Sequence, residues 1–435
     1  MCDRAMSRRS ERRSRIYIGT LKSWNEWAAL RGSALLKISP GTIFVRDCST
    51  PTKPPCECRG DYYVAAACLS RRSGANADDR RLFCFGAHRA PLQFGSLPVN
   101  ILLLQLKRIG DLILTMPAIA TLRANVPDSR LTLVVSSECT DLVPAITGVD
   151  RILMARRDLS DAALFLAIAR ERFDYCIDFT RNDRSAFLAF LSRARKRVVS
   201  RRIRDQSKTR AHVYNDFVKV RTRDMHTIDY NLGLLTPLGI GNVSRALNLK
   251  LPEATREKAN ALRRDSKIGE SYIIFHPGSA RAEKFWEPQR WAAVIDHVRS
   301  KSRINVVLTG GASKLEQQHL REIESKLRQP AVDLSGKTDL LILAALIAQA
   351  RLVVTVDSAP MHLAAALQIP QVVLFGPTNP FHWRPRGSPT LILQGESAAP
   401  LTKFSPVQPR FPMSQISTRA VINAMDSLLS PRAKT

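Results

Sequence analysis

The chain has 435 residues, 45% of them hydrophobic, so it is long enough for two or three domains with buried cores, and a disordered protein is excluded. No apolar stretch reaches the roughly 20 residues that cross a bilayer, so we do not expect an integral membrane protein. The 66 Lys and Arg residues against 38 Asp and Glu give a net charge of +28, which indicates an anionic partner: nucleic acid, acidic lipid or a phosphorylated substrate.

Residues 1–96 lack sustained periodicity, and we expect there a basic, poorly ordered extension or a translation start assigned too far upstream. The early arginines precede polar residues instead of an apolar core, unlike a signal peptide, so the expected location is the cytoplasm. Six of the eight cysteines lie in this segment, and the remainder is typical of a reduced cytosolic protein. Cys56 and Cys58 lack the usual zinc spacing, and we expect no metal.

From residue 97 onward, short apolar runs alternate with helical periods. The first series predicts strands at 99–105, 130–135 and 175–178, with helices at 115–125 and 162–171. The second series predicts strands at 272–275, 305–308, 352–356 and 371–375, and a helix at 421–429 near the end. This alternation is typical of an α/β fold with helices on both faces of a parallel sheet.

These two series predict two doubly wound domains that face a cleft. We predict a first domain at 97–251, a linker at the polar segment 252–269, a second domain at 270–412, and a C-terminal helix and tail at 413–435. In open α/β sheets, ligands bind beyond the carboxyl ends of the strands. The residues that directly follow each strand are therefore the candidates for function.

The turn after the first strand contains Arg108, Gly110 and Asp111. Gly110 permits a tight turn, and Asp111 stands where a helix begins, as either an N-cap or a general base at the cleft. A dinucleotide-binding turn would need further glycines here, and their absence counts against a nicotinamide or flavin enzyme.

In the second domain, the first turn offers Gly278 and Ser279, followed by Lys284. Backbone N–H groups, a hydroxyl and a compact positive charge are groups that hold phosphate, although turns of this kind are also common without a ligand. The Gly310–Gly311 turn after the next strand indicates either a close approach to a ligand or a sharp bend.

The most distinctive segment runs from Asp357 to His362. Pro360 is suited to the first turn of a helix, and the free N–H groups of that turn, with the helix dipole, attract an anion. Asp357 would hold sugar hydroxyls, because a carboxylate repels a pyrophosphate. His362 is either part of this site or a core or capping residue. After the last strand, Gly376 and Thr378 again offer an N–H group and a hydroxyl.

Together these segments resemble the ADP-heptose:lipopolysaccharide heptosyltransferases, glycosyltransferase family 9, over about residues 97–430. The motifs that carry the resemblance are Arg108–Asp111, His276–Ser279 with Lys284 and Trp286, Asp357–Ala364, and Phe375–Thr378. The resemblance implies a GT-B fold of two Rossmann-like domains, with the donor in the second domain and the acceptor in the first. It also implies inverting transfer by a monomer at the inner face of the inner membrane, with no obligatory metal or cofactor.

The resemblance also assigns roles. It implies that Asp111 is the catalytic base. The donor-binding residues it implies are Ser279, Lys284, Gly311, Asp357, Ser358, Ala359, His362, Gly376 and Thr378. Members often hold the donor ribose with an acidic residue after the Gly-Gly turn, whereas this chain has Ala312–Ser313–Lys314 there and Glu316 further on. Another nucleotide sugar therefore remains an alternative to ADP-heptose.

Basic residues concentrate at 181–223, where 14 Lys and Arg stand against 3 Asp and Glu. We expect Arg181 and Arg184, with Arg108, to contact the phosphates and Kdo carboxylates of a lipopolysaccharide core, or the basic stretch to contact the anionic inner leaflet. Charge that serves only solubility is the other interpretation of this stretch. A nucleic-acid-binding protein is the alternative from another class, although no zinc-finger, RNP-like or basic-zipper pattern is present. A nucleotide-sugar epimerase of the same architecture is a further alternative.

Overall fold

The structure is a computed structural model that describes residues 98–240, 242–247, 249–301 and 304–430, together with the backbone of two earlier strands. These strands, β1 (Ala34–Ser39) and β2 (Thr42–Asp47), pair antiparallel as a hairpin. The predictions of a poorly ordered extension and of no metal at Cys56 and Cys58 otherwise lie outside the described residues.

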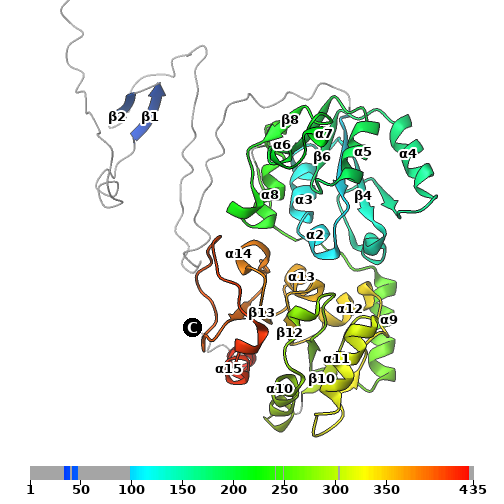
Figure 1. Ribbon diagram of the computed structural model, residues 1–435, viewed down its shortest axis with the longest axis vertical. Helices are drawn as coiled ribbons and strands as arrows, with labels where there is room; N and C mark the ends of the chain where they lie inside the picture. The colour runs from blue at the N-terminus through cyan, green and yellow to red at the C-terminus, as the bar shows by residue number, and fades with distance from the viewer. Residues whose placement is uncertain are drawn as a thin grey trace, which may run out of the picture. The chain divides into compact units, whose positions relative to one another are not determined.

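The first lobe, coloured cyan to green in Figure 1, is built on a six-stranded parallel sheet. The strand order in this sheet is β5-β4-β3-β6-β7-β8. Its strands are β3 (Asn100–Gln105), β4 (Arg130–Ser136), β5 (Arg151–Ala155), β6 (Tyr175–Asp178), β7 (Lys196–Ser200) and β8 (Asp216–Val218). Its helices are α2 (Ile109–Ile113), α3 (Met116–Asn125), α4 (Asp161–Arg170), α5 (Asp183–Leu191), α6 (Ile203–Gln206), α7 (Lys208–Ala211) and α8 (Thr227–Gly233). The central strand β3 is buried from Ile101 onward because helices cover both faces.

The second lobe repeats this topology with the sheet order β11-β10-β9-β12-β13-β14. Its strands are β9 (Tyr272–His276), β10 (Asn305–Leu308), β11 (Val332–Asp333), β12 (Leu352–Val356), β13 (Gln371–Phe375) and β14 (Thr390–Gln394). Its helices are α9 (Glu253–Asp265), α10 (Pro288–Lys301), α11 (Lys314–Glu324), α12 (Leu340–Ile347), α13 (Ala359–Ala366), α14 (Pro380–Trp383) and α15 (Thr418–Leu429). The predicted α/β class with two doubly wound sheets is confirmed.

The segment predicted as a linker contains helix α9. This helix packs against α12, and Arg263 donates from Nη1 to Oε1 of Gln349 at 3.0 Å. Just before α9, the chain is still bound to the first lobe, because Leu249 bridges to Ile146 and the Lys250 N–H donates to the Ala145 carbonyl at 3.1 Å. The chain therefore passes from one lobe to the other within a few residues.

The C-terminal helix begins at Thr418, three residues before the predicted start, and belongs to the second lobe. Its buried residues Val421, Ala424 and Met425 join the core cluster of α10 and the second sheet. The indole N–H of Trp286 donates to the Ile416 carbonyl at 3.0 Å, which fixes the start of this segment.

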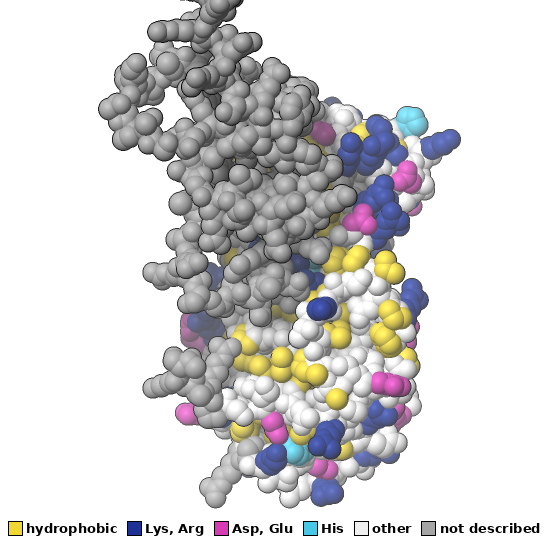
Figure 2. Space-filling view, turned by 90° about the vertical axis from the view of Figure 1, so that its left-hand side faces the viewer, with side chains coloured by type: hydrophobic (Ala, Val, Ile, Leu, Met, Phe, Trp, Pro, Cys, Tyr) yellow, Lys and Arg dark blue, Asp and Glu magenta, His cyan; other side chains and the backbone are white. Residues whose placement is uncertain are grey.

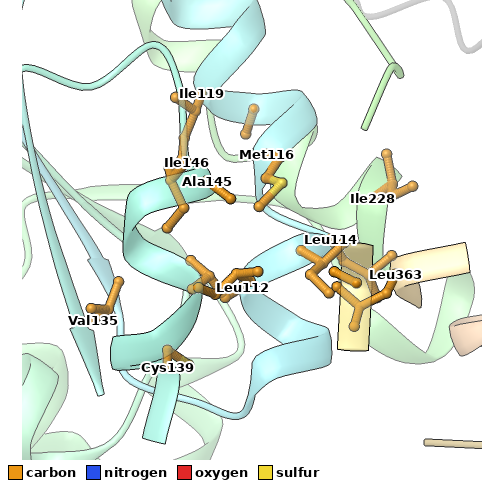
Figure 3. Packing of buried hydrophobic residues seen from close by; sticks show 14 of the residues in the cluster. Leu112, Leu114, Met116, Ile119, Val135, Cys139, Ala145, Ile146, Ile228 and Leu363 are labelled. Carbon is orange, nitrogen blue, oxygen red and sulfur yellow. The ribbon is translucent and has the colours of Figure 1, made fainter. Parts of the chain in front are cut away.

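The lobes share an apolar contact where α13 meets α2. Figure 3 shows Leu363 of α13 beside Leu114, which directly follows α2, with Ile228 of α8 close by. A second contact joins the start of α8 to α14 and the residues after it. There the Thr227 hydroxyl donates to the His382 carbonyl at 3.0 Å, and Arg386 Nη1 lies 2.9 Å from Asp229 Oδ2.

Many basic residues of the first lobe are exposed. Figure 2 shows Lys and Arg side chains gathered over the visible part of this lobe, with few acidic side chains among them. The exposed basic residues of the 181–223 stretch are Arg193, Arg195, Arg201, Arg202, Arg204, Lys208, Lys219, Arg221 and Arg223. The positive charge therefore lies on the surface of this lobe.

Candidate active site

A cavity of about 710 Å³ opens between the two lobes, at the carboxyl ends of both sheets. Both lobes contribute to its wall: the first through α2 and Glu138, and the second through the turns that follow β9, β10, β12 and β13 and through the start of α12. Ten of the thirteen predicted site residues line it: Arg108, Asp111, Ser279, Lys284, Gly311, Asp357, Ser358, Ala359, His362 and Thr378. The topology thus brings together turns that are up to 270 residues apart in the chain.

Lys284, Asp357 and Thr378 form a hydrogen-bonded group in this cavity. Lys284 donates from Nζ to Asp357 Oδ2 at 2.6 Å and to the Asp357 carbonyl at 2.9 Å. The Thr378 hydroxyl donates to the same Oδ2 at 2.6 Å. Asp357 Oδ1 accepts no hydrogen bond from any described residue, so it is available to a ligand hydroxyl. The group offers a positive charge and an acceptor side by side.

Asp111 lies within α2 and faces the cavity from the first lobe. The possibility that it is the N-cap is wrong, because Arg108 holds that position and no side chain caps the helix. Burial raises the pKa of the Asp111 carboxyl, and the Lys107 ammonium, 4.0 Å from Oδ1, opposes this rise. Burial in turn lowers the pKa of Lys107.

Hydrogen bonds to the Asp111 backbone fix its place. The Thr115 hydroxyl donates to the Asp111 carbonyl at 2.8 Å, and Gln105 Nε2 donates to the Thr115 hydroxyl at 2.7 Å. Asn231 of α8 donates from Nδ2 to the Leu114 carbonyl at 3.0 Å. The main chain that carries the carboxylate is therefore held by three polar side chains.

His362 brings the second lobe into contact with the turn of Asp111. A β-carbon on residue 110 would lie only 2.8 Å from His362 Cδ2, so the ring occupies the space left by Gly110. Burial lowers the pKa of His362 to about 4, which leaves the imidazole neutral at pH 7. Its Nδ1 is buried and has no hydrogen-bond partner among the described residues.

Residues 162–405, more than half of the chain, match the family model of glycosyltransferase family 9 (heptosyltransferase). The chain belongs to glycosyltransferase family 9. Lipopolysaccharide heptosyltransferase 3 of Escherichia coli is 27% identical to this glycosyltransferase over 330 residues, which are 74% of this chain and 96% of that protein. Lipopolysaccharide core heptosyltransferase OpsX of Haemophilus influenzae is 22% identical over 297 residues, 67% of this chain and 83% of that protein.

Solved structures of the family share the fold of this glycosyltransferase. The family 9 glycosyltransferase of Veillonella parvula superposes with a TM-score of 0.66 at 23% identity, covering 76% of this chain and 97% of that one. The ADP-heptose lipopolysaccharide heptosyltransferase II of E. coli superposes with a TM-score of 0.63 at 20% identity, covering 76% and 98%. The predicted GT-B architecture is therefore confirmed.

Glu316 is a cavity residue of the glycosyltransferase that lies outside the predicted set. Its Oε2 accepts the Gly311 N–H at 2.9 Å, and its carboxylate fills the space in which a β-carbon on Gly278 or Gly311 would stand. The Ser313 hydroxyl accepts the Glu316 N–H at 3.3 Å as the N-cap of α11. The pattern Ser-x-x-Glu is the sequence signal of a capping box, and it turns the glutamate back toward the preceding loop.

Three predicted residues of the glycosyltransferase do not line this cavity. Gly376 packs against Met413 and Phe411, so it makes room for the C-terminal segment. Arg181 lies over the Tyr230 ring, 5.0 Å from its centre, and Arg184 forms an ion pair with Asp161. Their proposed contacts with substrates stay predictions.

A second cavity, of about 440 Å³, lies on the first-lobe side of Asp111, the candidate catalytic base. Its lining residues are Leu106, Lys107, Arg108, Asp111, Glu138 and Arg157. Asp111 therefore belongs to both cavities of the glycosyltransferase. The sequence indicated Arg108 and Asp111 here, but it gave no signal for Arg157, which comes after an edge strand 46 residues later.

Proposed function

We propose that this glycosyltransferase transfers heptose from ADP-heptose to a Kdo- or heptose-bearing lipid A acceptor of the lipopolysaccharide inner core. The observation that carries the proposal is the placement of Asp111 opposite the group formed by Lys284, Asp357 and Thr378, across one cavity. The similar heptosyltransferases are named for lipopolysaccharide and its core, which supports the choice of sugar and acceptor. Membership of the family favours an enzyme of this kind over the nucleic-acid-binding and epimerase alternatives.

In the proposed reaction, the acceptor hydroxyl oxygen attacks the anomeric carbon of the donor and forms the new glycosidic bond. The carboxylate of Asp111 takes the hydroxyl proton. Burial raises the pKa of this carboxyl toward the working pH, and a general base is most effective when its pKa is near that pH. The bond from the anomeric carbon to the diphosphate breaks, and the electron pair leaves with the nucleoside diphosphate. A single displacement of this kind inverts the anomeric configuration.

The second lobe offers the charge that stabilises the leaving diphosphate. Lys284 supplies an ammonium group, and α13 begins at the cavity wall with Ser358 as an N-cap whose side chain makes no capping bond. The free N–H groups and dipole of that helix terminus favour an anion. We propose that this arrangement binds the diphosphate, while Oδ1 of Asp357 accepts from a heptose hydroxyl. That no metal is obligatory stays a prediction.

Glu316 is suited to the ribose of the donor. Its carboxylate is held by the Gly311 N–H at the cavity wall, where it keeps capacity to accept further hydrogen bonds from vicinal hydroxyls. We propose that Glu316 takes the role that the resemblance assigns to an acidic residue directly after the Gly-Gly turn. Binding of an ADP sugar then requires no acidic residue at positions 312–314.

The acceptor enters from the first lobe in this proposal. Lys107, Arg108 and Arg157 line the second cavity beside Asp111, and such side chains match the carboxylates and phosphates of an anionic core sugar. We propose a peripheral enzyme at the inner face of the inner membrane that acts as a monomer. Among the described residues, no helix is long and apolar enough to span a bilayer.

The test mixes the purified full chain with ADP-heptose and a heptoseless, Kdo-bearing lipid A, and follows ADP release. Release that needs both substrates supports the proposal, and mass spectrometry of the product identifies the added heptose. Donor binding without release would point to another acceptor. A chain that binds a different nucleotide sugar, and not ADP-heptose, would overturn the donor assignment.

A further inference from the structure

The outer face of α4 and α5 in the first lobe carries large apolar side chains in contact with solvent. Phe190 is 63% exposed, Leu166 is 48% exposed and Phe187 is 45% exposed, and Leu159, just before α4, is 96% exposed. We name these four residues the apolar α4–α5 face. Among the described residues, only three other large hydrophobic side chains are comparably exposed, and they are scattered: Val243, Leu315 and Val407.

The four residues form one surface because α4 and α5 pack side by side (Figure 1). The rings of Phe165 on α4 and Phe187 on α5 meet edge to face with centres 5.1 Å apart, and Arg184 of α5 pairs with Asp161 of α4. On both helices the exposed positions are mainly apolar: Ala162, Ala163, Leu166 and Arg170 on α4, and Asp183, Phe187 and Phe190 on α5. A contiguous exposed patch of this kind marks an interaction site more often than single residues do.

Basic side chains surround this face. Between residues 156 and 197 the exposed charged residues are Arg156, Arg157, Arg170, Arg172, Arg193 and Arg195 on the positive side, and Asp158 and Asp183 on the negative side. Arg193 is tied to the end of α4, since its Nη2 donates to the Ala169 carbonyl at 2.6 Å. Asp183 pairs with Arg210 at 3.3 Å, so part of the acidic contribution is neutralised. The rim of the face is therefore positive.

The apolar α4–α5 face begins next to the second cavity, which Asp111 and Arg157 both line. The carboxylate of Asp161, at the start of α4, accepts the N–H groups of Arg156 and Arg157 at 2.8 and 3.0 Å. Arg157, which has a positive φ of 73°, lines the second cavity together with Asp111. One short loop thus joins the wall of that cavity to Leu159.

We propose that the apolar α4–α5 face docks on the surface of an anionic lipid bilayer. Phe187, Phe190 and the two leucines then enter the headgroup region, and the surrounding arginines contact lipid phosphates, as in other interfacial proteins that combine apolar insertion with basic charge. A second copy of this chain fits less well, because a symmetric contact would bring two positive rims together. The inference deepens the proposed function. It rests on that function only for the statement that the acceptor is anchored in such a bilayer.

Vesicle flotation of the full chain, without donor or acceptor, tests the proposal. We expect binding to vesicles of phosphatidylglycerol and phosphatidylethanolamine, and about tenfold weaker binding to phosphatidylcholine vesicles. The double variant F187S/F190S is expected to lose about tenfold or more of the binding to anionic vesicles, because two apolar anchors are removed. The matched control L315S/V407S removes two exposed apolar side chains elsewhere and is expected to bind as the unchanged chain does.

Several outcomes would overturn the proposal. Equal binding of F187S/F190S and the control would show that the face is not the contact. Absence of binding to anionic vesicles would point to a protein partner, and a dimer that becomes monomeric only in F187S/F190S would assign the face to a second copy.

Turnover separates this proposal from the proposed function. F187S/F190S is expected to keep its turnover of a water-soluble, deacylated acceptor and to lose turnover of the same acceptor in vesicles. If no heptose is transferred in either assay, the proposed function fails, while the flotation result still decides the docking surface.

Discussion

Gly110 and His362 come from different lobes, and the imidazole of His362 fills the space that a β-carbon on residue 110 would need. The turn of the first lobe that carries Asp111 therefore packs closely against helix α13, on the donor side of the second lobe. A substitution at either residue is therefore expected to displace the other.

Gly110→Ala should displace the His362 ring, since its β-carbon would lie 2.8 Å from Cδ2. Because Asp111 is the next residue, we expect turnover to fall about tenfold or more, as for other small misplacements of catalytic groups. Steady-state kinetics of Gly110→Ala, His362→Ala and the double variant measure the coupling. If the two changes act through the same contact, the double variant will lose less than the product of the single losses.

Asp111→Asn should reduce turnover about 100-fold or more, in the range attributed to a general base. The amide is close in size to the carboxylate, so ADP binding, measured by calorimetry, should change little. Turnover equal to that of the unchanged enzyme would remove Asp111 from the mechanism.

The pH dependence of kcat/KM should carry the signature of the same carboxyl. Burial raises its pKa, so activity should fall, as the pH is lowered, at a higher pH than for an ordinary aspartate. The Lys107 charge lowers this pKa, and Lys107→Met should therefore shift the acid limb upward. A limb that stays in place or moves downward would contradict the assignment of the limb to Asp111.

Lys284→Met should weaken ADP binding and also destabilise the second lobe. The substitution leaves Asp357 with one hydrogen-bond donor, Thr378, in place of two, and loss of one partner of a mostly buried ion pair costs about 3 kcal/mol. Thr378→Val removes only a neutral hydroxyl and should cost about 1 kcal/mol. Thermal unfolding and calorimetric titration with ADP separate the two effects, and equal losses in both variants would argue against a special role for the ammonium group.

Glu316→Ala should remove the discrimination of the enzyme for the ribose hydroxyls. We expect the unchanged enzyme to bind ADP about tenfold more tightly than 2′-deoxy-ADP or 3′-deoxy-ADP, according to which hydroxyl the carboxylate accepts, because a hydrogen bond to a charged group contributes about 1.5 kcal/mol or more. The variant should bind all three nucleotides with similar affinity. Discrimination that survives in Glu316→Ala would place the ribose elsewhere.

Most of the two sheets could be predicted from the sequence, because their central strands are continuous apolar runs buried on both faces. The predicted strands at 305–308 and 371–375 coincide with β10 and β13. Strands at or next to the edge of a sheet are not predicted where this signal fails. β7 begins with Lys196 and Arg197, and β11 has only two residues. The sequence of α9 predicts a linker because the helix is mostly polar, which agrees with the burial of only Thr255 and Ala259 among its residues.

The site could be predicted where a residue follows a predicted strand directly, as Asp357 follows β12. It could not be predicted where side-chain direction decides. Glu316 reaches the cavity between the lobes from the first turn of α11, and Arg157 reaches the second cavity from a loop after the edge strand β5. Conversely, Gly376 follows β13 but faces Met413, because the C-terminal segment returns over that turn.

The short passage between the lobes restricts how the cleft can open. Lys250 is still hydrogen-bonded to the first lobe and α9 begins at Glu253, so the backbone torsions that can serve as a hinge lie mainly in Leu251 and Pro252. The proline ring fixes one of these torsions and narrows the range of the residue before it. Any rotation of one lobe against the other is therefore confined to a few backbone torsions, which limits the positions that the donor-side groups can take opposite Asp111.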